Sequence, residues 1–327
     1  MKPIFQNCKI VGSGVNSELY HSQTAGRGTP EFIISPSSLK VFAACPARWK
    51  AGYEPPASEA KSWGNLLDCA LLTPDKMGER FACKPATYPD AKTGEPKPFN
   101  ANSNWCKDWI AKQGDKQIVS SAELDEVASA VKRLLDDETI AAYHAASQKQ
   151  VHAKGEYHDK ATGIIVPVQC LIDFVPRKDS EFQKSLGDLK STRNASQRPF
   201  AIWCYSAGYH IQAAFDLDLY MAAVNPNRDE NGEDRQDWIF ILQENYAPYE
   251  TGRRLLGQDF IDIGRATYQD ALTRYAKCIK TGKWGGYDPE EEFSLVSPLP
   301  YMEFNALSEK LERDQSTFTA DDNDIPT

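Results

Sequence analysis

Apolar positions in the first half of the chain recur mostly at helical spacing. The first such stripe follows Ser35, a suitable N-cap, and Pro36, a residue favoured at the first helical position. Further stripes predict helices within residues 61–77 and 120–146. Residues 84–104 between them are rich in Pro, Lys and Asn, which indicates a loop insertion.

The second half of the chain alternates between strand-like and helix-like patterns. Short apolar segments predict two strands within 154–177 and one strand each at 184–192 and 236–245. Longer apolar stripes predict helices at 197–224 and 251–284. This order of elements predicts an α/β fold with a mixed central β-sheet flanked by helices.

The chain divides into three regions by pattern and charge. Residues 1–34 have weak periodicity and several Gly, Ser and Thr, so we expect a loosely structured lead-in. Residues 35–287 are expected to form one domain. Residues 288–327 contain eleven acidic and two basic residues, so they carry a net charge of −9, and we expect an acidic, partly disordered tail. Because the whole chain also has a net charge of −9, residues 1–287 are neutral overall.

Composition limits the class of protein. No apolar run approaches the roughly 20 residues that a membrane-spanning helix needs, and no signal peptide is readable, so we expect a cytoplasmic protein without a membrane partner. The eight cysteines include no C-x-x-C pair, which favours buried thiols over zinc or iron–sulfur ligands. Residues 177–198 contain six basic and three acidic residues, and such a local excess can attract a polyanion. An ordinary charged surface is the alternative.

The segment KSLGDLKST, residues 184–192, contains the main candidate for chemistry. In a strand, Asp188 and Lys190 project to the same face, and Leu189 points to the other. Asp173 ends the preceding predicted strand, and a hairpin connection can bring it beside Asp188. Two converging carboxylates suit Mg²⁺ or Mn²⁺, and a nearby lysine can position water or stabilise charge on a phosphate. Solvent-facing carboxylates with a salt-bridging lysine are the alternative.

The spacing Asp–(15)–Asp-x-Lys on consecutive strands is the arrangement of the PD-(D/E)xK nucleases. The blocks IIVPVQCLIDFVP, GDLKST and GYHIQAAF, together with SSLKVFAACPARWKAG and YAKCIKTGKWGGY, resemble the exonuclease VIII (RecE-type) branch of that superfamily. The resemblance extends from about Ser35 to Tyr287.

The resemblance implies a Mg²⁺-dependent exodeoxyribonuclease that acts on double-stranded DNA ends, with 5′-to-3′ resection for recombination. It also implies a ring-like homo-oligomer and a RecT-like single-strand annealing partner. It assigns the metal to Asp173, Asp188 and the Leu189 carbonyl, and the activation of water to Lys190. Further catalytic and DNA-binding candidates are Glu156, Gln212, Ser191, Thr192, Arg193, Arg198 and Tyr209.

Two positions depart from the family pattern. The family usually has Gly-x-x-x-His on an early helix, and here Gly64 is followed by Asp68, which would be a further metal ligand. A solvent-facing Asp68 is the alternative. The family also has Gln-x-x-x-Tyr, and here Gln212 is followed by Asp216.

Two other functions remain open. The first is another PD-(D/E)xK nuclease, either RecB-like or a restriction-type endonuclease. The second is a catalytically inactive DNA-binding or assembly protein of the same fold, which the altered Asp68 would favour.

Overall fold

The fold is that of a computed structural model, which describes residues 4–15, 20, 25–54, 59–227, 229, 232–287 and 293. Residues up to Trp284 form one compact unit. The expected acidic tail, residues 288–327, lies outside the described residues except for Phe293.

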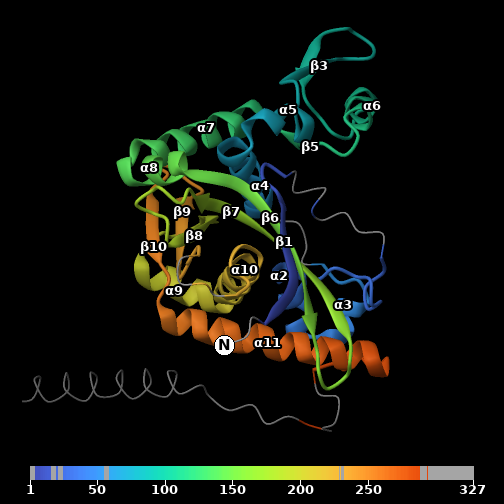
Figure 1. Cartoon of the computed structure of the whole chain (residues 1–327). Helices are drawn as coiled ribbons and strands as arrows, with labels where there is room; N and C mark the ends of the chain where they lie inside the picture. The colour runs from blue at the N-terminus through green and yellow to red at the C-terminus, as the bar shows by residue number, and fades with distance from the viewer. Residues whose placement is uncertain are drawn as a thin grey trace, which may run out of the picture. The chain divides into compact units, whose positions relative to one another are not determined.

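A six-stranded mixed sheet organises the described chain, in the order β1-β6-β7-β8-β9-β10 (Figure 1). Neighbouring strands are antiparallel except for β8 and β9, which are parallel. The strands of this sheet are β1 (Phe5–Gly12), β6 (Ser147–His158), β7 (Ile165–Pro176), β8 (Ser185–Thr192), β9 (Asp237–Glu244) and β10 (Thr251–Leu255). The expected α/β fold with a mixed central sheet is confirmed.

Helices cover both faces of the sheet (Figure 1). Two hydrophobic clusters of buried side chains fill the space between the layers. Helices α2 (Pro36–Ala44), α3 (Pro46–Lys50), α10 (Tyr209–Val224) and α11 (Gln258–Thr281) pack on one face. Helices α4 (Glu59–Leu72), α7 (Ser121–Asp136) and α8 (Glu138–Ala146) pack on the other. Helix α9 (Gln197–Ser206) precedes α10 in the parallel connection from β8 to β9.

A small group of elements projects from the main body between α4 and α7 (Figure 1). It contains two two-stranded sheets, β2 with β5 and β3 with β4. Its elements are η1 (Pro74–Lys76), α5 (Met77–Arg80), β2 (Phe81–Cys83), β3 (Thr87–Pro89), β4 (Pro96–Pro98), α6 (Asn104–Lys112) and β5 (Gln117–Val119). The predicted loop insertion 84–104 therefore contains a short hairpin.

The expectation of a loose lead-in is wrong for Phe5–Gly12, because these residues form β1 and pair with β6. Their pattern is weak because β1 is an edge strand with mostly exposed side chains. Phe5, which is 1% exposed, is its main contribution to the core.

Three predicted helical segments are divided in the structure. Residues 120–146 form two helices, because Asp137 ends α7 and caps α8 by accepting hydrogen bonds from Thr139 N and Ile140 N. Residues 197–224 divide at Gly208, whose φ of 67° is left-handed. The first residues of the expected helix 251–284 form strand β10 instead, and its helical part ends at Gly282, as the sequence predicts.

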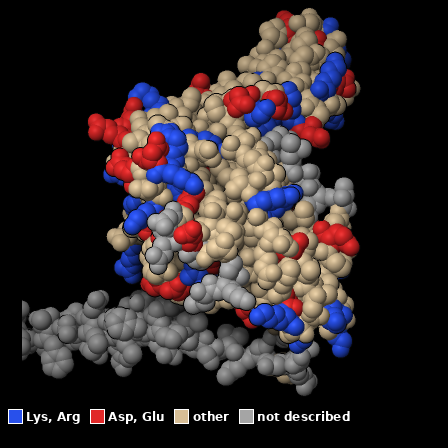
Figure 2. All heavy atoms as spheres, viewed as in Figure 1, with Lys and Arg blue, Asp and Glu red and all other residues tan. Residues whose placement is uncertain are grey.

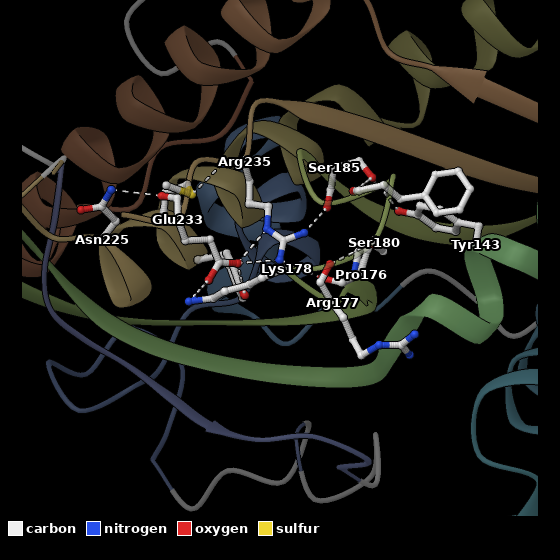
Figure 3. A network of polar contacts seen from close by, with 12 residues as sticks. Tyr143, Pro176, Arg177, Lys178, Ser180, Ser185, Asn225, Glu233 and Arg235 are labelled. Carbon is white, nitrogen blue, oxygen red and sulfur yellow. Dashed lines mark hydrogen bonds and ion pairs between the residues drawn. The ribbon is translucent and has the colours of Figure 1, made fainter. Parts of the chain in front are cut away.

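A buried arginine fixes the two strand ends that lead to the site (Figure 3). Arg235 donates hydrogen bonds to the carbonyl oxygens of Pro176, at the end of β7, and Ser185, at the start of β8, at 2.7 and 3.1 Å. Glu233 compensates its charge and also pairs with Lys178 at 3.1 Å. This clamp holds the end of β7 and the start of β8 together at the two ends of the connection between them.

The described surface mixes both charges, and Figure 2 shows basic and acidic side chains interspersed over one face. All eight cysteines are free thiols, and four of the five most buried have exposed fractions of 1% or less. Among the described residues, no helix is both long enough and apolar enough to cross a membrane.

Candidate active site

The end of the β7–β8 pairing brings the two predicted carboxylates together. Phe174 and Gly187 are register partners in this antiparallel pair. Counting one residue further along both strands places Asp173 opposite Asp188. There the carboxylate of Asp173 accepts a hydrogen bond from the backbone N–H of Leu189 at 2.8 Å. At this point a side-chain acceptor replaces the backbone carbonyl that would continue the sheet hydrogen bonding. The two aspartates are 8% and 3% exposed.

Asp188 is held from two sides. Its Oδ2 pairs with the ammonium of Lys190, two residues on and therefore on the same face of β8. Its Oδ1 accepts a hydrogen bond from Gln212 Nε2 on α10 at 3.0 Å. Lys190 Nζ also lies 5.0 Å from the centre of the Tyr209 ring. The structure thus brings Asp188, Lys190, Gln212 and Tyr209 into one cluster, and Leu189 packs into the opposite hydrophobic cluster.

Helix α4 supplies the third carboxylate. Gly64 allows this helix to approach β8 closely, because a Cβ at this position would lie 2.9 Å from Ser191 Oγ. Asp68, one turn later, faces Gln150 of β6. Gln150 Nε2 donates to Asp173 Oδ1 at 2.9 Å and lies 3.5 Å from Asp68 Oδ1, so one amide connects both acids. Asp68 therefore lies beside the site and not on an isolated solvent-facing position.

Burial and repulsion from neighbouring acids raise the proton affinity of Asp173, Asp68 and Asp216. Burial, followed by the charges of Asp188 and Asp68, raises the pKa of Asp173 well above its usual range. Burial also raises the pKa of Asp68 to about 6, although Arg80, 3.9 Å away, opposes the shift. The pKa of Asp216 is raised well above its usual range by burial and then by Asp188. Burial is the largest single effect and acts to lower the pKa of Lys190, but Asp188, Tyr209 and Asp173 together outweigh it and the pKa is raised.

The donor set fits a hard divalent cation. Within the described residues, no three His, Cys, Asp or Glu side chains converge closely enough to form a ready-made ion site. Mg²⁺, however, commonly binds through one or two carboxylates and keeps several waters. Asp173, Asp188 and the Leu189 carbonyl can supply oxygen ligands of that kind, and a cation would relieve the repulsion that raises the pKa of Asp173.

The predicted DNA contacts lie at the end of β8, in the loop after it and in helices α9 and α10. Ser191 is half-buried against Gly64, and Thr192 exchanges hydrogen bonds with the backbone of Asn194 at 3.2 Å. This local turn is the ordinary role of a hydroxyl at a strand end. Arg193 and Arg198 are exposed, and neither has an ion-pair partner within the described part of the chain.

The structure does not bring Glu156, one of the catalytic candidates, to the carboxylate cluster. Glu156 pairs in register with Pro167, whereas Gln150 is the residue of β6 opposite Asp173. Six residues of strand separate the two positions, which is about 20 Å. The carboxylate of Glu156 instead binds His158 and Asn7, both at 2.7 Å, and these contacts lower its pKa.

Sequence reasoning missed three side chains around the cluster: Gln150, Arg80 and Lys40. Gln150 was overlooked because the strand that carries it was expected to start only at residue 154, whereas β6 begins at Ser147. Lys40 lies on α2, and its Nζ is 5.3 Å from the centre of the Tyr209 ring. No spacing rule connects Lys40 or Arg80 to KSLGDLKST, because the contacts depend on packing between distant elements.

A family model described as "PDDEXK-like domain of unknown function (DUF3799)" matches residues 35–291. Among solved structures, the chain is similar to a protein from Eubacterium rectale named "Putative exonuclease", with a TM-score of 0.51 and 16% sequence identity. The alignment covers 90% of this chain and 99% of that one. This likeness concerns the fold. No curated protein matches the chain.

Proposed function

The chain belongs to the PDDEXK-like domain family over residues 35–291, and from that premise we propose that it is a metal-dependent exodeoxyribonuclease acting on the ends of duplex DNA. The observation that carries the proposal is the convergence of Asp173, Asp188 and Lys190 where β7 and β8 separate. The resemblance of the sequence blocks to exonuclease VIII supports action on DNA ends.

Asp173, Asp188 and the Leu189 carbonyl would hold the divalent ion, with Asp68 as a further ligand. When bound, the ion supplies a Lewis acid for the phosphate and lowers the pKa of a bound water. Lys190 would orient the attacking water or stabilise negative charge that develops on the phosphate. Gln212 holds Asp188 in place through its 3.0 Å hydrogen bond.

The same resemblance supports three finer proposals: cleavage in the 5′-to-3′ direction, a ring-like homo-oligomer around the DNA, and cooperation with a RecT-like annealing protein. Mg²⁺ is the proposed ion, and Mn²⁺ offers the same preference for oxygen ligands. For DNA contact, the proposal includes Ser191, Thr192, Arg193, Arg198 and Tyr209, because all of them surround or follow the end of β8.

One experiment tests the activity and separates it from its alternatives. A linear duplex labelled at one 5′ end and a closed circular duplex are incubated with the protein in Mg²⁺, Mn²⁺ or EDTA, and products are resolved by length. The control is Asp188→Asn, which removes a ligand charge and keeps the shape of the side chain.

We expect progressive degradation of the linear duplex in Mg²⁺, an intact circle, and no degradation in EDTA or by Asp188→Asn. Internal cuts in both substrates would instead identify an endonuclease. Binding of duplex without cleavage in either metal would identify an inactive DNA-binding protein, and the proposed activity would be refuted.

A further inference from the structure

Lys40 on α2 reaches the candidate active site from the helical layer. Its Nζ lies 5.3 Å from the centre of the Tyr209 ring, and Lys190 Nζ lies 5.0 Å from the same point. Two ammonium groups therefore share one aromatic side chain. Tyr209 is in turn held by the indole N–H of Trp203, which donates to its hydroxyl at 3.0 Å.

The position of Lys40 is built by the backbone break between α9 and α10. Gly208 has no Cβ, and a Cβ there would lie 2.8 Å from Lys40 Cδ, so the aliphatic stem lies directly on this glycine. Lys40 Nζ donates to the carbonyl oxygen of Ala207 at 3.2 Å. Gly208 thus has two roles: its left-handed φ separates α9 from α10, and its missing Cβ leaves room for the aliphatic stem of Lys40.

Lys40 is a half-buried cation. Within the described residues, no carboxylate forms an ion pair with its ammonium. Asp188, the acid whose charge acts most strongly on Lys40, already pairs with Lys190. Burial, and then the charge of Lys190, lower the pKa of Lys40 to about 8. A charge in this state gains stability when an anion binds beside it.

We propose that Lys40 is a second phosphate-binding lysine of this site, which contacts a backbone phosphate of the bound strand beside the one that Lys190 serves. The inference rests on the proposed action on DNA. It assigns the two lysines beside the Tyr209 ring to phosphate oxygens of one strand. The competing role for Lys40 is structural, as a cap on the Ala207 carbonyl at the end of α9.

The test measures binding of a fluorescent duplex end by anisotropy, in Ca²⁺ and over a series of salt concentrations, with the intact probe verified on a denaturing gel. Lys40→Met removes the charge and keeps the stem, and Lys40→Arg keeps a charge. The matched control is Lys132→Met, because Lys132 is an exposed lysine on α7, 76% accessible and paired with Asp136. Thermal unfolding of each variant is measured in parallel.

We expect Lys40→Met to weaken binding by about tenfold. The slope of log affinity against log salt should fall by about 0.9, the value for one lost phosphate contact. Lys132→Met should change neither quantity, and Lys40→Arg should keep most of the slope. The melting temperature of Lys40→Met should be equal to or higher than that of the wild type, since the variant removes a half-buried charge that has no ion-pair partner among the described residues.

A second measurement identifies the phosphate. Each probe in a series carries one uncharged methylphosphonate linkage at a different phosphate. At the phosphate that Lys40 contacts, this replacement should weaken binding by the wild type but should not weaken binding by Lys40→Met any further. If Lys40→Met does not fold, Lys40→Gln removes the charge and carries the same test.

The inference is overturned if Lys40→Met binds with the affinity and salt slope of Lys132→Met, and a lowered melting temperature would then identify the structural cap. If the wild type still cleaves duplex DNA in that case, only the role of Lys40 is refuted, and the proposed nuclease activity is not. If the wild type neither binds nor cleaves duplex DNA, the proposed function fails and the inference fails with it.

Discussion

Asp68 offers the sharpest test of the electrostatics of the site, because it is an acid held at an unfavourable position. Asp68→Asn removes its charge and keeps its shape. Its pKa rises from 3.8 to about 6 in the folded protein, chiefly by burial. This rise in pKa corresponds to about 3 kcal/mol, since a tenfold change in proton affinity is worth about 1.4 kcal/mol. The side chain is 28% exposed, so solvent screening reduces the expected effect to about 2 kcal/mol.

The sign of the effect follows from the direction of the shift. The folded pKa lies above the unfolded value, so the folded state holds the proton more tightly. Below about pH 4 the buried Asp68 therefore does not lower the stability of the wild type. As the pH rises through 6, ionisation of Asp68 lowers that stability by its full contribution. In EDTA, Asp68→Asn should be more stable than the wild type by about 2 kcal/mol at pH 7.5, and equally stable near pH 4.

The assay is urea unfolding followed by circular dichroism, at both pH values, with EDTA or with Mg²⁺. Asp108→Asn, at an exposed position on α6, is the matched control and should match the wild type throughout. An ion at 100 times its dissociation constant stabilises the folded state by about 2.7 kcal/mol. Saturating Mg²⁺ should therefore stabilise the wild type more than Asp68→Asn, because the variant lacks one proposed ligand and binds the ion less tightly.

Two results would refute this reasoning. If Asp68→Asn is less stable than the wild type at pH 7.5 in EDTA, Asp68 is not an acid strained by burial. If Mg²⁺ stabilises both proteins equally, Asp68 is not a ligand of the ion.

The other predictions concern catalysis and DNA binding, each with circular dichroism as the test of folding. Asp173→Asn and Asp188→Asn should each reduce cleavage of linear duplex by roughly a thousandfold, because each removes a ligand charge; wild-type rates in either would exclude the proposed metal site. Lys190→Met should lose about 10²- to 10⁴-fold in rate while Mg²⁺ binding, measured by calorimetry, persists, and Lys190→Arg should not restore the rate fully. Glu156→Gln should cleave within about twofold of the wild type, since Glu156 binds Asn7 and His158 away from the cluster, and a large loss would contradict this placement. Removal of residues 288–327, which carry a net charge of −9, should tighten duplex binding most at low salt, and unchanged affinity would show that the segment does not compete with DNA.

Local chemistry alone determined several features of this protein. Ser35 and Pro36 begin α2, and Ser35 accepts a hydrogen bond from Ser38 N, as a capping pattern predicts. Gly282 ends α11 in the left-handed conformation. The convergence of Asp173 with Asp188 also followed from the sequence, since both alternate with apolar residues on consecutive strands whose connection is short.

Features without a local signal could not be found in this way. Strand β1 exposes most of its side chains, so its identity depends on hydrogen bonds to β6. Glu156 was a candidate because a sequence motif gives the order of residues along the chain but not the pairing register of the strands. The register of β6 and β7 instead places Gln150 opposite Asp173.

The surroundings of the carboxylates were decided by tertiary structure. Arg80 and Lys40 come from elements whose distance in sequence from β7 and β8 carries no information about contact. Asp68 was a candidate through the family resemblance, and the packing of α4 decided that it lies beside the site. The close approach of α4 at Gly64 and the path of Lys40 over Gly208 arise from packing of helices on the two faces of the sheet. The sequence by itself determined which carboxylates and lysine meet on β7 and β8, because alternation along a strand is a local property. Only the folded chain decided which further charges surround them, because burial and repulsion depend on every element that packs against the site.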